Sequence, residues 1–237
     1  MPLETESTFT VKKSPLWISR ANSQLTQQDR EILESDDAWF PDSVINAVQC
    51  MLKRDYPHVE GLADVCLLEL PTEIKPFKRG RFVQVLINLE GGRKNHWFTI
   101  SNMCHAEDTV AVYDSRADSV ADWPLDNLNT VFYMMPYRRK LKVVVEQVTQ
   151  QVDMNQCGPM CLAFAKALCS GRNPADIQFS DDPRILRDHV IQCLLVDRIR
   201  SFPTGSRSPI LRTELVNDRE PARDRPRPRK KSSSAPR

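Results

Sequence analysis

The chain has 237 residues, of which 33 are Lys or Arg and 31 are Asp or Glu, so its formal net charge is +2. This length can bury a hydrophobic core, and a hydrophobic fraction of 41% with 27% charged residues excludes a wholly disordered chain. No apolar run approaches the ~18 residues of a membrane-spanning helix, and residues 1–15 lack the apolar core of a secretory signal. We therefore expect no membrane contact, a nuclear or cytoplasmic location, and reduced thiols at the seven cysteines.

The chain divides into three parts by composition. Residues 1–35 are expected to be a loosely structured N-terminal segment. Within it one short helix is expected over 24–33, with Thr26 at its entry. Residues 36–203 carry the regular apolar patterns and are expected to form the folded domain. Residues 204–237 are rich in Pro and basic residues, so they are expected to form a basic disordered tail.

The charge is divided unevenly between these parts. Residues 200–237 contain eleven Lys or Arg and four Asp or Glu, a net +7, so residues 1–199 sum to −5. The tail can be a simple solvated end. Its basic cluster is also typical of nuclear-import or nucleic-acid-contacting segments, which makes nucleic acid a second partner to test. The cluster consists of Arg227, Arg229, Lys230 and Lys231.

The folded domain is expected to begin with a helix and to continue with strands. Apolar residues recur at helical spacing from Val44 to Leu52, with Asp42 or Ser43 as the N-cap and Pro57 as the stop. The short link between the second and third strands favours an antiparallel hairpin. The predicted strands are 82–87, 96–101, 109–113 and 143–148.

Two helices complete the domain. The run CGPMCLAFAKALCSG predicts a helix that is apolar on most of its surface, with Pro159 in its first turn and Gly171 just past its end. A last helix is expected over 183–199. The order of helix, antiparallel strands, helix and helix indicates the α+β class, with a central antiparallel sheet and flanking helices.

Cys157 is the candidate nucleophile. A cysteine hydrolase needs an ionisable thiol, an imidazole that takes its proton, and a group that orients the imidazole. Cys157 is predicted to lie where a loop meets a helix N-terminus, whose unpaired N–H groups and partial positive charge stabilise a thiolate. Gly158 would let a substrate approach the backbone closely. Most of the other six cysteines are expected to be small buried hydrophobes.

The hairpin geometry selects His96 and Asp114. If strands 96–101 and 109–113 form a hairpin centred near residue 105, paired residue numbers sum to about 210, which places His96 opposite Asp114. Opposed Cβ atoms lie ~4.5–5.5 Å apart, within reach of a His–carboxylate hydrogen bond. Taken alone, the same pattern also fits a strand that merely begins at His96 and another that ends at Asp114.

Gln151 is the candidate oxyanion donor. Acyl transfer generates an oxyanion that fixed donors must stabilise. The Gln151 amide, six residues before Cys157, could act together with the Cys157 backbone N–H. Gln147, Gln150 and Gln156 are close alternatives, and only the spacing selects Gln151.

Taken together, these elements resemble the ubiquitin-like-protein-specific cysteine proteases, which include the SUMO proteases and, more distantly, the adenovirus protease. The resemblance spans about residues 36–203 and is greatest to the compact versions carried in mobile elements of animal genomes. Each element is weak alone, whereas four in this order and spacing are specific. The elements are Trp39-Phe40-Pro41-Asp42, His96-Trp97, Tyr113-Asp114-Ser115, and Gln151 followed by Cys157-Gly158.

The resemblance implies a papain-like fold and a peptidase that needs no cofactor. In this family His96 would be the general base, Asp114 would orient it, Cys157 would attack, and Gln151 would bind the oxyanion. Trp39 and Trp97 would wall a narrow tunnel that admits a Gly-Gly tail. Asp42 would contact a basic patch on the partner, a SUMO-like ubiquitin-like protein or its conjugates.

Three departures from the family pattern leave other functions open. Gln156 stands where the family usually has Asp, the loop before Cys157 contains no Gly, and Pro41 replaces a common polar residue. The first alternative is a catalytically idle module that binds a ubiquitin-like protein and contacts nucleic acid through its basic tail. The second is a papain-like acyltransferase, against which the paired Trp residues argue.

A zinc site is the remaining alternative, and the spacing argues against it. The nearest candidate ligands contain no Cys-x-x-Cys pair, and Cys161 falls one turn along an apolar helix. We therefore expect no metal. The candidate ligands are Cys104, His105, Cys157 and Cys161.

Overall fold

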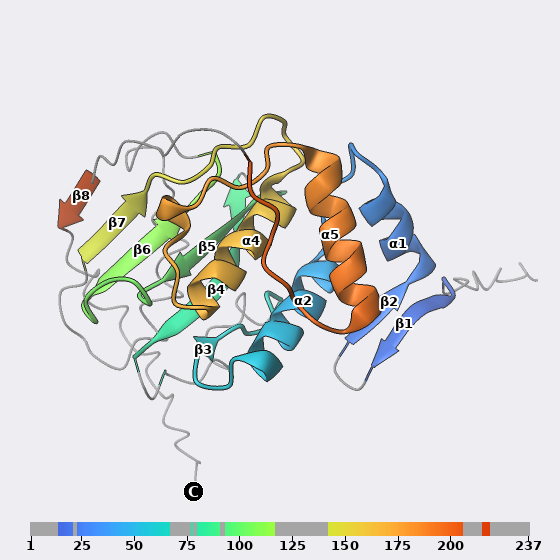
Figure 1. Ribbon diagram of the computed structural model, residues 1–237, viewed down its shortest axis with the longest axis horizontal. Coiled ribbons are helices and arrows are strands. Elements are labelled where there is room, and N and C mark those ends of the chain that lie inside the picture. Colours follow the sequence, from blue (N-terminus) through green and yellow to red (C-terminus); the bar gives the residue numbers. More distant parts are fainter. Residues whose placement is uncertain are drawn as a thin grey trace, which may run out of the picture.

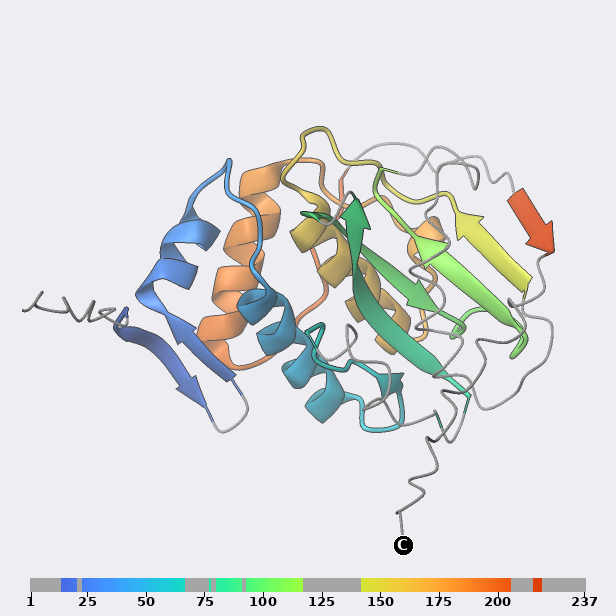
Figure 2. The ribbon, with the colours of Figure 1, turned by 180° about the vertical axis from the view of Figure 1, so that it is seen from behind.

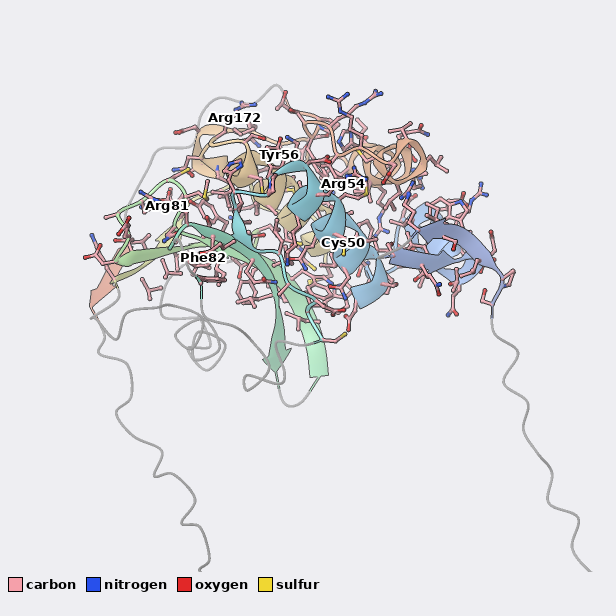
Figure 3. All side chains as sticks on the ribbon, turned by 90° about the horizontal axis from the view of Figure 1, so that it is seen from below. Cys50, Arg54, Tyr56, Arg81, Phe82 and Arg172 are labelled. Carbon is pink, nitrogen blue, oxygen red and sulfur yellow. The ribbon has the colours of Figure 1, made fainter. Side chains whose placement is uncertain are left out.

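The computed structural model shows helices packed against one side of a β-sheet (Figures 1 and 3). The α+β class expected from the order of elements is confirmed. Among the described residues, no helix is long and apolar enough to cross a membrane. The structure describes residues 14–20, 23–66, 77, 80–90, 93–116, 142–205 and 215–218.

The main sheet has six strands in the order β3-β4-β5-β6-β7-β8. The pairs β3–β4 and β6–β7 are parallel and the other three are antiparallel, so the sheet is mixed, with the expected antiparallel pairing in its centre at β4, β5 and β6. Parallel neighbours need a long crossover, and residues 114–141 connect β6 to β7. The strand bounds are β3 Glu60–Gly61, β4 Phe82–Glu90, β5 Arg93–Ser101, β6 Thr109–Tyr113, β7 Lys142–Glu146 and β8 Leu215–Asp218.

Helix α4 (Cys157–Cys169) lies across β4 and β5 and forms the centre of the core. All its residues are buried, as the apolar run predicted, and Gly171 follows its end with φ +73°. Over residues 82–87 of β4 both alternating sets of side chains are buried. The sheet and α4 therefore form a rigid base for the loops at their ends.

The N-terminal segment is more ordered than its composition suggested. Strands β1 (Leu16–Arg20) and β2 (Ser23–Thr26) form a hairpin, and α1 (Gln27–Glu34) follows. Thr26 caps α1 as predicted. Leu25 and Leu33 are fully buried, and α1 packs on α5 (Pro183–Val196), as Figure 2 shows. The expectation that residues 1–35 are loosely structured was therefore wrong for 16–34.

Helix α2 (Asp42–Asp55) begins as expected but uses a different cap. Pro41 is the N-cap and makes no side-chain cap bond, while the Ser43 hydroxyl donates to Asp29 Oδ1 in α1 at 2.5 Å. The proposed capping by Asp42 or Ser43 was wrong because Ser43 links α2 to α1 instead.

The two C-terminal expectations also need correction. Helix α5 ends at Val196, three residues before the predicted end, and the next residue, Asp197, adopts φ +55°. Strand β8 pairs with β7, so the expected tail over 204–237 is not wholly disordered. The cluster Arg227, Arg229, Lys230 and Lys231 lies outside the described residues.

Candidate active site

Strand directions bring the candidate residues to one end of the sheet. Strands β6 and β7 are parallel, so Asp114 and Gln151, which follow them, lie beyond the same sheet edge. Strand β5 is antiparallel to β6, which places His96, in its first half, at that edge as well. Helix α4 begins there with Cys157. Segments that are distant in sequence therefore meet at one point.

His96 and Asp114 form a buried pair. His96 Nε2 lies 2.5 Å from Asp114 Oδ1, and the backbone N–H of Arg116 donates to the same oxygen at 2.8 Å. Both side chains are less than a tenth exposed. The observed register pairs Thr99 with Tyr113, so paired numbers sum to 212 and not 210. The predicted contact exists because a shift of two residues keeps His96 and Asp114 on the same face, where diagonal neighbours also touch.

The environment of His96 favours its protonated form. Burial alone would lower the pKa of His96, but the hydrogen bond and charge of Asp114, together with the neighbouring Cys157, raise it from 6.5 to about 9. Nε2 is occupied by Asp114, and the buried Nδ1 has no hydrogen-bond partner among the described residues. Cys157 is one of the groups that raise the pKa of His96, and Nδ1 is the ring nitrogen that Asp114 leaves available.

Cys157 is fully buried at the first position of α4. Trp39 Nε1 donates to its sulfur at 3.2 Å, and the residue lies in the first turn of the helix, where backbone N–H groups lack partners within the helix.

Burial makes five of the six other thiols poor nucleophiles. It raises the pKa of Cys50, Cys104, Cys161 and Cys193 and raises that of Cys169 to about 12, which keeps all five protonated. A second Cys–His contact, Cys193 Sγ to His189 Nε2 at 3.4 Å, is unsuited to catalysis because burial also lowers the pKa of His189. A neutral thiol beside a neutral ring is not an activated nucleophile.

The loop before Cys157 is fixed by glutamines. Gln151 accepts a hydrogen bond from Ser115 Oγ at 2.6 Å, and its amide nitrogen donates to the Asp153 carbonyl. The structure therefore places Gln151 in the predicted loop, with its amide directed at the loop itself. Gln156, fully buried, accepts from the Val152 N–H at 3.1 Å.

Gln156 also donates to the carbonyl of Asp181 at 3.0 Å, so one side chain links both ends of the loop to the segment before α5. This amide gives a reason why Gln can stand at this position: it supplies both a donor and an acceptor, whereas a carboxylate only accepts. The sequence marked Gln156 only as a departure.

The rings of Trp39 and Trp97 stack on each other. Their ring centroids are 5.7 Å apart at an interplanar angle of 27°. Trp97 is fully buried and donates through Nε1 to the Phe40 carbonyl at 3.0 Å, whereas Trp39 is half-buried. In this arrangement the Trp97 ring stacks on the Trp39 ring, and the Trp39 indole contacts the Cys157 sulfur.

The structure shows further contacts at two neighbouring positions, Gly158 and Asp42. A Cβ on Gly158 would lie 2.6 Å from Phe40 Cβ, so the packing of this fully buried ring requires a glycine here. Asp42 lies at the start of α2 and accepts from the exposed Cys66 thiol at 3.3 Å. Within the described ranges, no group of three or more His, Cys, Asp or Glu is arranged to hold a metal ion.

No protein-family model and no curated protein matches the sequence. Solved structures do match the fold. The C-terminal Ulp1 protease domain in complex with SMT3, the yeast ortholog of SUMO, is 16% identical with a TM-score of 0.57, over 80% of this chain and 91% of that chain.

Two further structures agree with this match. SUMO protease Ulp1 with its catalytic cysteine oxidised to a sulfenic acid is 14% identical with a TM-score of 0.58, over 78% of this chain and 90% of that chain. The Ulp1-like SUMO protease catalytic domain of Chaetomium thermophilum is 16% identical with a TM-score of 0.51, over 75% and 81%. The likeness confirms the fold that the sequence resemblance predicted.

Proposed function

We propose that this protein is a cysteine protease that cleaves after the Gly-Gly C-terminus of a SUMO-like ubiquitin-like protein, or at a similar site. The observation that carries the proposal is the buried His96–Asp114 pair, whose imidazole interacts with Cys157 at the start of a helix. The likeness to SUMO proteases supports it, because the same fold surrounds these side chains.

The proposed reaction begins with a thiolate and an imidazolium. The Cys157 thiolate attacks the glycine carbonyl carbon and forms a tetrahedral oxyanion. As the intermediate collapses, the His96 imidazolium transfers its proton to the leaving amine, and the acyl group remains as a thioester. His96, now neutral, takes a proton from water, the hydroxide attacks the thioester, and Cys157 leaves as the thiolate. Asp114 keeps the ring oriented throughout.

Oxyanion binding requires a local change at Gln151. Its amide nitrogen donates to the Asp153 carbonyl, so it must turn toward the reacting carbonyl to join the Cys157 backbone N–H. The Ser115 hydroxyl bonded to Gln151 Oε1 would act as the pivot for this rotation. The change is small because Gln151 N–H stays bonded to the Ser115 carbonyl at 2.9 Å.

Substrate access requires movement of Trp39. Cys157 is fully buried and Trp39 bonds to its sulfur, so a Gly-Gly tail can reach the thiol only if this indole shifts away from Trp97. A narrow slot then accepts glycine and excludes larger side chains. Trp97, which is held to the Phe40 carbonyl, would form the fixed wall.

The surface beside the nucleophile is suited to a folded protein partner. Val152 and Met154 lie in the loop before Cys157 and are 64% and 62% exposed. Neighbouring apolar side chains at such exposure favour contact with an apolar patch on a partner. We place the body of the ubiquitin-like protein against this loop, with Asp42 opposite a basic residue of the partner.

One observation favours the alternative of an idle binding module. The sulfur is covered and the oxyanion donor is engaged within its own loop, which also describes a site that binds without turnover. A substrate comprising a ubiquitin-like protein with a fluorophore amide after Gly-Gly separates the two functions. The protease predicts hydrolysis by the wild type and loss of at least a thousandfold in Cys157→Ser and His96→Gln. If the protein is an idle binding module, the wild type and both variants should bind the same ubiquitin-like protein, and none of them should hydrolyse the substrate.

A further inference from the structure

Arg187 is a buried arginine that connects three segments around the site. It belongs to α5, the helix that lies between α1 and α4 in Figure 1, and is 0% exposed. Its guanidinium donates to the Ile32 carbonyl at 3.2 Å, to the Asn155 carbonyl at 3.3 Å, and to the Ala38 carbonyl. Its Cζ lies 4.9 Å from the centroid of the Phe40 ring.

The same nitrogen joins the two segments that matter for the proposed chemistry. Nη2 donates both to Ala38, the residue before Trp39, and to Asn155, two residues before Cys157. The side chains carried by these segments meet where Trp39 donates to the Cys157 sulfur. A planar fork can hold two carbonyls in fixed relation, which a flexible ammonium cannot do.

The charge of Arg187 is not neutralised by a contacting carboxylate. None of the ion pairs among the described residues includes it, and its buried Nε has no hydrogen-bond partner there. Burial lowers the pKa of Arg187, and Asp153, Asp36 and Cys157 act against that shift. Since arginine stays protonated at neutral pH, its buried positive charge lies against the carbonyl of Asn155, two residues before Cys157. Such a charge is costly to bury, which a purely structural link would avoid.

We propose that Arg187 is a positioning residue that aligns the Trp39 and Cys157 segments and whose positive charge makes the Cys157 sulfur more reactive toward electrophiles. This inference rests on the proposed role of Cys157 as nucleophile. It adds a cation from outside the His–Asp pair to the forces that activate the thiol, together with the helix N-terminus.

The test measures the rate at which iodoacetamide alkylates Cys157 in the full chain at pH 6.5, with mass spectrometry to locate the modification. The reagent is small and requires no hydrolysis, so the readout survives if the proposed protease activity fails. Arg187→Gln removes the charge and keeps a donor, whereas Arg187→Lys keeps the charge and removes the fork. Arg184→Gln is the control, because Arg184 lies in α5 and donates to the Glu34 carbonyl at 2.7 Å, and its hydrogen bonds and ion pairs within the described part of the chain do not include residues 155–157.

We expect Arg187→Gln to slow alkylation at least tenfold, Arg187→Lys less than threefold, and Arg184→Gln not at all. Thermal unfolding monitored by circular dichroism verifies that each variant is folded. Wild-type reactivity in folded Arg187→Gln overturns the inference, as does an equal loss in the Gln and Lys variants, which indicates a structural role alone. If Arg187→Gln does not fold, a folded Arg187→Lys that loses tenfold or more overturns the charge-based part and with it the proposal.

Discussion

Replacing Asp114 by Asn isolates the charge that raises the pKa of His96. Asn keeps the shape and a carbonyl oxygen at the position 2.5 Å from His96 Nε2, so the ring can keep its orientation while the negative charge is lost. The pKa of His96 is raised from 6.5 to about 9, which corresponds to about 3 kcal/mol between its two protonation states. Asp114 supplies the leading favourable part of this shift, against burial.

We therefore expect the pKa of His96 to fall by about one unit or more in Asp114→Asn, or ~1.4 kcal/mol. At pH 8 the protonated fraction of His96 would then fall from about 0.9 to about 0.5 or less, so kcat/KM would fall about twofold or more, and above pH 9 the loss would approach tenfold. The assay is an NMR titration of the histidine ring protons. The chain has only four histidines, so the His96 resonance is the one missing from a His96→Gln sample.

The same shift fixes the sign of a stability effect. The folded state holds the His96 proton more tightly than the unfolded state, so this stabilisation is complete below pH 6.5 and is lost as pH rises toward about 9. Asp114→Asn should flatten that pH dependence in denaturant unfolding. Glu146→Gln is the matched control, because Glu146 is a buried carboxylate paired with a different histidine, His105, at 2.9 Å. An unchanged His96 titration in Asp114→Asn, or an equal shift in Glu146→Gln, would refute the reasoning.

Two further substitutions test the packing around the thiol. Gly158→Ala places a methyl group 2.6 Å from buried Phe40 and should cost ~1–3 kcal/mol and most activity, whereas Gly171→Ala, which is strained by φ +73° with no atom within 4 Å of its new Cβ, should cost ~1–2 kcal/mol and spare activity. Denaturant unfolding and peptide hydrolysis measure both; equal activities would contradict the assignment. Trp39→Phe removes the indole N–H that bonds to the Cys157 sulfur and should slow iodoacetamide alkylation about threefold to tenfold, while a rate equal to wild type would show that this hydrogen bond does not stabilise the thiolate.

Local pattern was sufficient where one element determines its own structure. The run after Gln156 is apolar on nearly every position, so helix α4 and its end near Gly171 could be predicted from sequence. The contact of His96 with Asp114 followed from side-chain parity, which survived a register error of two residues. The N-terminal hairpin was missed because its strands are short and only Leu25 is fully buried.

Tertiary packing decided what the sequence could not. Arg187 has the same local pattern as a solvated arginine on α5, and its burial depends on carbonyls from three other segments. Gln156 was noticed only as an unusual residue, since its two loop bonds require the folded positions of Val152 and Asp181. The parallel pairing of β7 likewise depends on a long connection whose path leaves no local signal.

The most direct test of the proposed function is covalent labelling with a SUMO-like protein that ends in Gly-Gly followed by an electrophile. A Cys–His–Asp protease predicts a single adduct on the wild type, located by mass spectrometry at Cys157, and none on Cys157→Ala. Equal labelling of both proteins, or an adduct on another cysteine, would contradict the assignment of Cys157 as the nucleophile.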